Sequence, residues 1–190
     1  QKQQEKVLIN QLKVANSTIS NMQLLAVKDY DSMQFWTDAT TGASKVVSQA
    51  NFEKYFLPYL KVLKYCQRNK GCFSDDVVFN EGNGDSVNTN SNYVKAILNN
   101  GMSIAAAGLT FGTYASGSFL VDVNGFKGPN EWGKDLFYFA ISNEKFGIYP
   151  SFSSAFKEEN SVRGGYSRSK RYGSCYQSMT DDYKPYKAYC

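Results

Sequence analysis

Residues 1–33 carry a single apolar stripe at helical spacing, and this pattern restricts the possible folds more than any other feature of the sequence. The stripe consists of Leu8, Leu12, Ala15, Ile19, Met22 and Ala26, and Val7, Val14 and Leu25 are expected to widen it. Since neither proline nor glycine occurs before Gly42, the segment predicts an amphipathic helix of about seven turns. A helix with one apolar face has to bury that face, so it must pack on another layer of the protein.

The second half of the chain changes to short apolar runs that are typical of strands. Residues 102–107, 118–123 and 136–141 are rich in β-forming side chains, and glycine-bearing turns separate them. Because these connections are too short for parallel crossovers, they predict an antiparallel meander over 101–141. We also expect a short helix at 51–57 capped by Asn51, a turn-rich connection at 80–92 and an irregular tail at 142–190. The sequence therefore predicts one α+β domain over 1–190, in which a long helix lies across an antiparallel sheet with decorated loops.

Histidine is absent from the 190 residues, which excludes every site that needs an imidazole. Ser-His-Asp triads, histidine-ligated zinc and imidazole general bases are therefore unavailable. The sequence also contains no G-x-S-x-G, P-loop or dinucleotide-binding motif. A net charge of +4 is too small to indicate a partner by itself, and no run of 18 apolar residues occurs. These observations favour a structural or binding protein over an enzyme.

The four cysteines fall into two local pairs, Cys66 with Cys72 and Cys175 with Cys190. Neither pair has the C-x-x-C spacing, and no histidine can complete a mixed zinc site. We expect a disulfide within each pair because short loops close most easily, although four cysteines allow three pairings. Disulfides would place the chain in an oxidising compartment outside the cytoplasm. The alternative, four buried free thiols in a cytosolic protein, is disfavoured by the terminal position of Cys190.

Asp122, Asn124 and Gly125 have the spacing that opens a loop for a hard cation. Two oxygen-bearing side chains stand two residues apart, the glycine permits a tight turn, and Asp135 could return to complete the site. One interpretation is therefore a calcium site with Asp122, Asn124 and Asp135 as ligands. The other is a turn that ends a strand, in which Asp122 and Asn124 accept hydrogen bonds from nearby backbone N–H groups. The sequence leaves both interpretations open.

A basic, tyrosine-rich segment lies at 160–180 and contains no acidic residue. Its cations are Arg163, Arg168, Lys170 and Arg171. Cations that contact phosphates and aromatic rings that stack on bases are typical of proteins that bind single-stranded or non-specific DNA. The same composition also suits a solvated loop or a loop that contacts other proteins. We expect a solvated or protein-contacting loop, with nucleic-acid binding as the alternative.

Residues 122–137 carry the most specific motif of the chain. It has the form D-x-N-G-x-K-G-P-N-x-x-G-x-D-x-F, and its members are Asp122, Asn124, Gly125, Lys127, Gly128, Pro129, Asn130, Gly133, Asp135 and Phe137. This motif, the opening segment 1–13 and the run 55–61 resemble type IV pilin-like and type II secretion pseudopilin-like proteins, which have a prepilin-type N-terminal signal. The resemblance touches residues 1–66 and 101–141, and does not cover the middle or the tail.

The resemblance implies a non-enzymatic structural subunit of a type IV pilus or a type II secretion-like filament. In that family a long N-terminal helix anchors in the inner membrane through its hydrophobic first half, and later packs against other pilin or pseudopilin subunits. That first half is absent, so we expect residues 1–190 to be an ectodomain that starts within the helix. The implied location is a cell-surface filament or the periplasm.

Two further implications of the resemblance concern ligands. Some secretion pseudopilins bind calcium near the corresponding sheet, although their ligand pattern does not transfer residue by residue. We expect no other cofactor. The alternative role within the family is a minor pilin that binds DNA or a host surface through segment 160–180.

Overall fold

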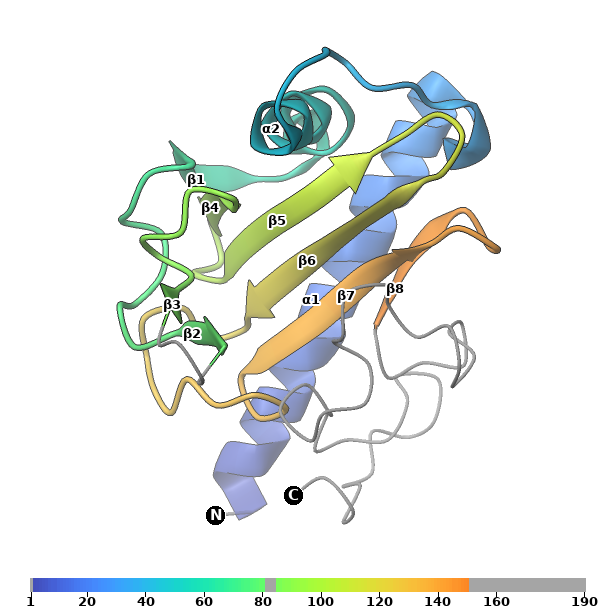
Figure 1. Ribbon diagram of the computed structural model, residues 1–190. Coiled ribbons are helices and arrows are strands. Elements are labelled where there is room, and N and C mark those ends of the chain that lie inside the picture. Colours follow the sequence, from blue (N-terminus) through green and yellow to red (C-terminus); the bar gives the residue numbers. More distant parts are fainter. Residues whose placement is uncertain (1, 81–84, 151–190) are drawn as a thin grey trace.

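The computed structural model describes residues 2–80 and 85–150, in which helices pack on an antiparallel sheet (Figure 1). The N-terminal helix α1 (Lys2–Tyr30) is followed by a short 3₁₀ helix, η1 (Met33–Phe35). A second helix, α2 (Ser44–Tyr55), and a second 3₁₀ helix, η2 (Leu57–Tyr59), precede the first strand. The predicted α+β class with a long N-terminal helix is confirmed.

Six strands form the main sheet in the order β1-β4-β5-β6-β7-β8, and every neighbouring pair is antiparallel. They are β1 (Val62–Gln67), β4 (Val94–Leu98), β5 (Ser103–Thr110), β6 (Ser116–Asp122), β7 (Leu136–Ser142) and β8 (Gly147–Pro150). A separate two-stranded ribbon joins β2 (Val78–Asn80) to β3 (Asp85–Ser86). Because β4 to β8 are consecutive along the chain, the meander predicted for 101–141 is confirmed and continues by one strand on each side.

Several elements differ from the sequence-based expectation. The irregular conformation expected from residue 142 onward is wrong for Gly147–Pro150, which forms β8, and the connection expected at 80–92 contains β3. β1 and β4 were not predicted, since Lys64 and Lys95 interrupt their apolar runs. β8 was not expected either, because it contains both glycine and proline, two residue types that are depleted in strands.

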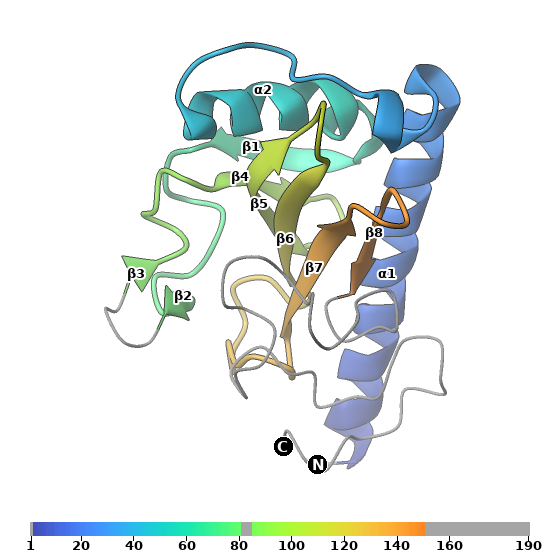
Figure 2. The same ribbon diagram turned by 45° about the vertical axis from the view of Figure 1, so that its right-hand side comes forward.

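The predicted stripe of α1 lies at the centre of the larger hydrophobic core. All six members, from Leu8 to Ala26, are at most 9% exposed, and they pack with α2 and with one face of the sheet. Figures 1 and 2 show α1 running along the sheet from its lower end to the level of α2. Val7, Val14 and Leu25 are 51%, 47% and 45% exposed, so the expectation that they widen the buried stripe is wrong. They lie on an exposed flank of the stripe.

Asn51 is a second correction, because it lies within α2 and does not cap a helix that starts there. The helix begins at Ser44 without a side-chain cap, and Asn51 is 0% exposed. Its Oδ1 accepts a hydrogen bond from the N–H of Ala39 at 2.7 Å, and its Nδ2 donates to Asp38 at 2.6 Å and to the carbonyl oxygen of Leu109 at 3.0 Å. Asn51 thus ties the connection between the two helices to β5.

The opposite face of the sheet is covered by the chain between β1 and β4. A second, smaller core forms there from Cys66, Cys72, Phe73, Val77, Val87, Tyr93, Ala105, Leu120 and Leu136. Adjacent strand residues alternate between the two cores, as Ile104 and Ala105 do in β5. The predicted disulfide between Cys66 and Cys72 is present and belongs to this second core.

Helix α1 also reaches one edge of the sheet. The backbone N–H of Ile148 in β8 donates to Gln23 Oε1 at 2.6 Å. Gly147 permits this close approach, because a Cβ atom at that position would lie 2.8 Å from Gln23 Nε2. Across residues 2–80 and 85–150, α1 and the shorter helices lack the combination of length and apolar content needed to span a bilayer.

Candidate functional site

Two aspartates meet where β6 runs into the loop 123–135 and β7 begins. Asp122 is the last residue of β6, Asp135 immediately precedes β7, and both are 0% exposed. The backbone N–H of Val123 donates to the carbonyl oxygen of Asp135 at 2.9 Å, which extends the ladder between the two strands. The antiparallel pairing of β6 with β7 therefore brings the two ends of the loop, and both carboxyl groups, together.

The carboxyl group of Asp135 organises the loop. Its Oδ2 accepts hydrogen bonds from the N–H of Asn130 at 2.8 Å and from Asn124 Nδ2 at 3.2 Å, and its Oδ1 accepts one from the N–H of Glu131 at 2.7 Å. Burial raises the pKa of Asp135 above its usual value, and these donors oppose the rise because they favour the charged form. Both carboxylate oxygens of Asp135 therefore accept hydrogen bonds from the loop.

Asp122 is less well satisfied than Asp135. Its Oδ1 accepts a hydrogen bond from the N–H of Asn124 at 3.2 Å, whereas its Oδ2 is buried without a partner. Burial and the nearby negative charge of Asp135 raise the pKa of Asp122 to about 8. At neutral pH this carboxyl group therefore requires either a proton or a positive charge beside it.

Three buried acceptor oxygens in the cluster have no hydrogen-bond donor: Asp122 Oδ2, Asn124 Oδ1 and Asn130 Oδ1. Buried polar atoms nearly always have a partner, since an unpaired one costs about 1–3 kcal/mol. Carboxylate and amide oxygens are the hard ligands that calcium prefers, so the donor set fits this ion. No group of three or more His, Cys, Asp or Glu side chains that could hold a metal occurs within the described residues. A cation would therefore depend on the two asparagines as well as on the two aspartates.

The turn interpretation explains a different part of the same cluster. Asn124 bonds to Asp122 through its backbone N–H, and its side-chain Nδ2 donates to the carbonyl oxygen of Gly128 at 3.2 Å. Gly125 has a φ of 67°, and a Cβ atom there would lie 2.3 Å from the carbonyl oxygen of Gly101, so only glycine fits. The turn accounts for the bonded atoms and leaves the three acceptor oxygens unexplained. Calcium at Asp122, Asn124 and Asp135 stays a prediction, to which the geometry adds Asn130.

The loop 123–135 also contacts the segment that covers the second core. Asn130 Nδ2 donates to Asp76 Oδ2 at 2.8 Å, and the indole N–H of Trp132 donates to the carbonyl oxygen of Val78 at 3.2 Å. Hydrogen bonds from Ser74 and Asn130 lower the pKa of Asp76. The cluster is thus connected to the chain between the disulfide and β2.

The remaining site residues predicted from sequence divide into one confirmed pair and two untested groups. Cys66 and Cys72 form the disulfide. Cys175 and Cys190, and the cations Arg163, Arg168, Lys170 and Arg171, lie outside the described residues. The second disulfide and the role of segment 160–180 therefore stay predictions.

Sequence reasoning did not single out Lys95 or assign a role to Asn130. Lys95 is completely buried in β4. Two residues to either side of it, Tyr93 belongs to the second core and Ile97 packs against that core. Apolar residues at both of these positions are a usable signal, because side chains two apart in a strand share a face. Asn130 was visible only as a member of the motif, since its partner Asp76 is distant in sequence.

Comparisons with protein-family models, with curated proteins and with solved structures find no match for this chain. A function for the chain therefore has to be inferred from the sequence motif and from the geometry described above.

Proposed function

We propose that the chain is a structural subunit of a type IV pilus or a type II secretion-like filament, and that it acts by assembly rather than by catalysis. The observation that carries this proposal is that α1 has apolar residues on two sides. Its six-residue stripe is buried in its own domain, whereas Val7, Val14, Leu24 and Leu25 are 45% to 64% exposed. A helix that packs on its own sheet and keeps further apolar residues outside is suited to contact helices of other subunits.

The length and position of α1 support the same proposal. The helix has 29 residues, and its N-terminal turns extend past the lower end of β7, where that strand begins, in both views (Figures 1 and 2). The motif that carries the family resemblance forms the connection between β6 and β7, where Asp135 and Gly125 shape the loop. These two motif residues therefore have an architectural role, which suits a structural subunit.

The test uses the full-length protein in the organism that produces it. Val14→Asp places a charge on the exposed side of α1, and Ser20→Asp places the same charge on another exposed position of that helix as the control. We expect the parent and Ser20→Asp in sheared surface filaments or in the secretion-filament fraction, and Val14→Asp to be lost from them. Both variants should keep the folded circular dichroism spectrum of the parent, because neither residue is buried.

Two results would contradict the proposal. One is Val14→Asp entering filaments as well as Ser20→Asp does. The other is a parent protein that never fractionates with filaments under conditions in which the assembly system is active.

A further inference from the structure

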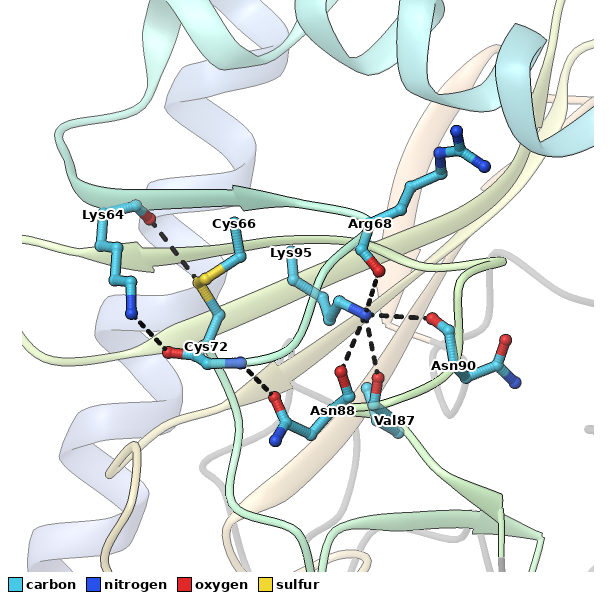
Figure 3. The surroundings of a disulfide bond; sticks show 9 residues. Lys64, Cys66, Arg68, Cys72, Val87, Asn88, Asn90 and Lys95 are labelled. Carbon is cyan, nitrogen blue, oxygen red and sulfur yellow. Dashed lines mark hydrogen bonds between the residues drawn. A yellow bond between two sulfur atoms is a disulfide. The ribbon is translucent and has the colours of Figure 1, made fainter.

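A lysine is buried on the face of the sheet opposite α1. Lys95 lies in β4, close to the Cys66–Cys72 disulfide (Figure 3). It is 0% exposed and is paired with Gln67 of β1, the residue that follows Cys66. Burying an ammonium group is costly unless other oxygens replace the water that it loses. The position of Lys95 therefore depends on the acceptors around it.

Four backbone carbonyl oxygens surround the ammonium group and form what we call the carbonyl cage. Lys95 Nζ lies 3.0 Å from the oxygens of Arg68, Asn88 and Asn90 and 3.4 Å from that of Val87. An ammonium group has three N–H donors, so the three shorter contacts use all of them. Burial lowers the pKa of Lys95 to about 8, and the carbonyl oxygens favour its charged form.

The cage joins two segments that are distant in the sequence. Arg68 belongs to the loop that the Cys66–Cys72 disulfide closes, whereas Val87, Asn88 and Asn90 precede β4. The side chain of Asn88 adds a second link, because its Oδ1 accepts a hydrogen bond from the N–H of Gly71 at 2.6 Å. Lys95 and Asn88 together fix the disulfide loop against segment 87–90.

The disulfide loop has a backbone conformation that needs constraint. Gln67 has a φ of 52° and Gly71 a φ of 112°, and the left-handed region is unfavourable for a residue such as glutamine. Lys64 Nζ donates to the carbonyl oxygen of Gly71 at 3.2 Å on the exposed side of the loop. The covalent bond between Cys66 and Cys72 closes this loop and so limits the positions that the Arg68 carbonyl oxygen can take.

We propose that the Cys66–Cys72 disulfide and the buried Lys95 form one redox-controlled unit. The oxidised form holds the carbonyl cage closed and keeps Lys95 away from solvent; reduction opens the cage, exposes Lys95 and releases segment 87–90. In the reduction, a dithiol supplies two electrons and two protons, the S–S bond breaks, two cysteine thiols form and the dithiol becomes a disulfide. The α1 side of the sheet keeps its packing in both forms, because its core contains neither cysteine.

Lysine acetylation with an N-hydroxysuccinimide ester tests the unit directly. The oxidised parent and the Cys66→Ser, Cys72→Ser double variant are labelled for increasing times, and the rate at each lysine is read by peptide mass spectrometry. Lys45, exposed in α2, is the internal reference. We expect Lys95 to react at least about tenfold more slowly than Lys45 in the parent, and the two rates to converge in the double variant.

Global unfolding must be separated from local opening of the cage. Near-ultraviolet circular dichroism reports the stacked pair Trp36 and Tyr55, whose ring centroids are 4.4 Å apart in the larger core. Labelling through local opening should also be insensitive to low urea concentrations, unlike labelling through global unfolding. A folded double variant that still protects Lys95, or an oxidised parent in which Lys95 reacts as fast as Lys45, would overturn the proposal.

A second measurement serves if the double variant does not fold. Lys95→Met removes the ammonium group from the oxidised protein, and Lys61→Met, at an exposed lysine just before β1, is the matched control. Because the cage stabilises the closed loop, dithiothreitol should reduce the disulfide about tenfold faster in Lys95→Met than in the parent. Lys61→Met should behave as the parent does. Equal reduction rates in Lys95→Met and the parent would contradict the coupling.

Discussion

Replacing Ile19 with alanine is expected to lower the free energy of unfolding by about 3 kcal/mol, within the usual range for a buried isoleucine. Ile19 is 1% exposed and lies in the middle of the stripe that α1 presents to the sheet. The substitution removes roughly three methylene equivalents at about 0.8 kcal/mol each, and the cavity left behind adds to this loss. For a domain of this size the melting temperature should fall by about 6–12 °C.

Val14 supplies the matched control, because it is also a β-branched aliphatic residue in α1. It is 47% exposed, so Val14→Ala removes little buried surface and slightly improves the helix propensity. We expect a change of at most about 0.5 kcal/mol. Ile19→Asp should be more destabilising than Ile19→Ala, since it buries an unpaired charge, whereas Lys13→Asp on the exposed face should cost little.

The assay is urea unfolding followed by circular dichroism, with thermal unfolding as a second measurement. The reasoning fails if Ile19→Ala and Val14→Ala shift the transition equally, or if Val14→Ala has the larger effect. Either result would mean that α1 does not face the sheet through the stripe.

Four further predictions concern the polar groups and the basic segment. Millimolar calcium should raise the free energy of unfolding, by about 2.7 kcal/mol at a hundredfold excess over Kd, and should therefore raise the melting temperature. Asp122→Ala should abolish this increment, and identical melts in calcium and in chelator would leave only the turn interpretation. In chelator, Asp122→Asn should be more stable than the parent at about pH 8 and equal to it near pH 4. The pKa of Asp122 is raised to about 8 in the folded protein, so the parent loses stability as the pH rises through that value, whereas asparagine does not titrate. A difference that is constant with pH would contradict this. Asn51→Ala should cost about 3 kcal/mol in urea unfolding because it leaves its buried partners unpaired, whereas the exposed Asn10→Ala should cost almost nothing. We expect no gel shift with DNA; a salt-dependent shift that replacement of Arg168, Lys170 and Arg171 by alanine weakens would instead support the alternative role.

The parts of the fold that sequence predicts are those whose signal is local and periodic. The stripe from Leu8 to Ala26 repeats often enough to fix the buried face of α1, and β5, β6 and β7 each contain an apolar run of at least three residues. The expected burial of the residues beside that stripe is wrong, because the sequence does not distinguish a buried apolar residue from an exposed one such as Val14. The buried role of Asn51 is not visible in the sequence, because its partners Asp38 and Leu109 are brought to it only by the tertiary fold.

The candidate site likewise has a part that the sequence predicts, and the carbonyl cage lies outside that part. Asp122, Asn124 and Asp135 were recognisable from their spacing, and the structure places all three in one cluster. The cage around Lys95 could not be predicted, because its acceptors are backbone carbonyl groups, which every residue possesses. Only the folded loops select which of these groups meet the ammonium.

Through the hydrogen bond between Gln23 and Ile148, α1 protects the β8 edge of the sheet against aggregation. An edge strand with unpaired backbone groups is a template for strands of other molecules, and proteins block such edges with helices, bulges or charges. At the β8 edge, Gln23 of α1 accepts a hydrogen bond from one of these backbone groups, the N–H of Ile148. At the other edge, β1 has irregular register and carries Lys64. A chain whose α1 is lost or detached would uncover both the β8 edge and the larger core at once. Polymerisation through added strands would then compete with correct folding, so an intact helix protects the sheet as well as completing it.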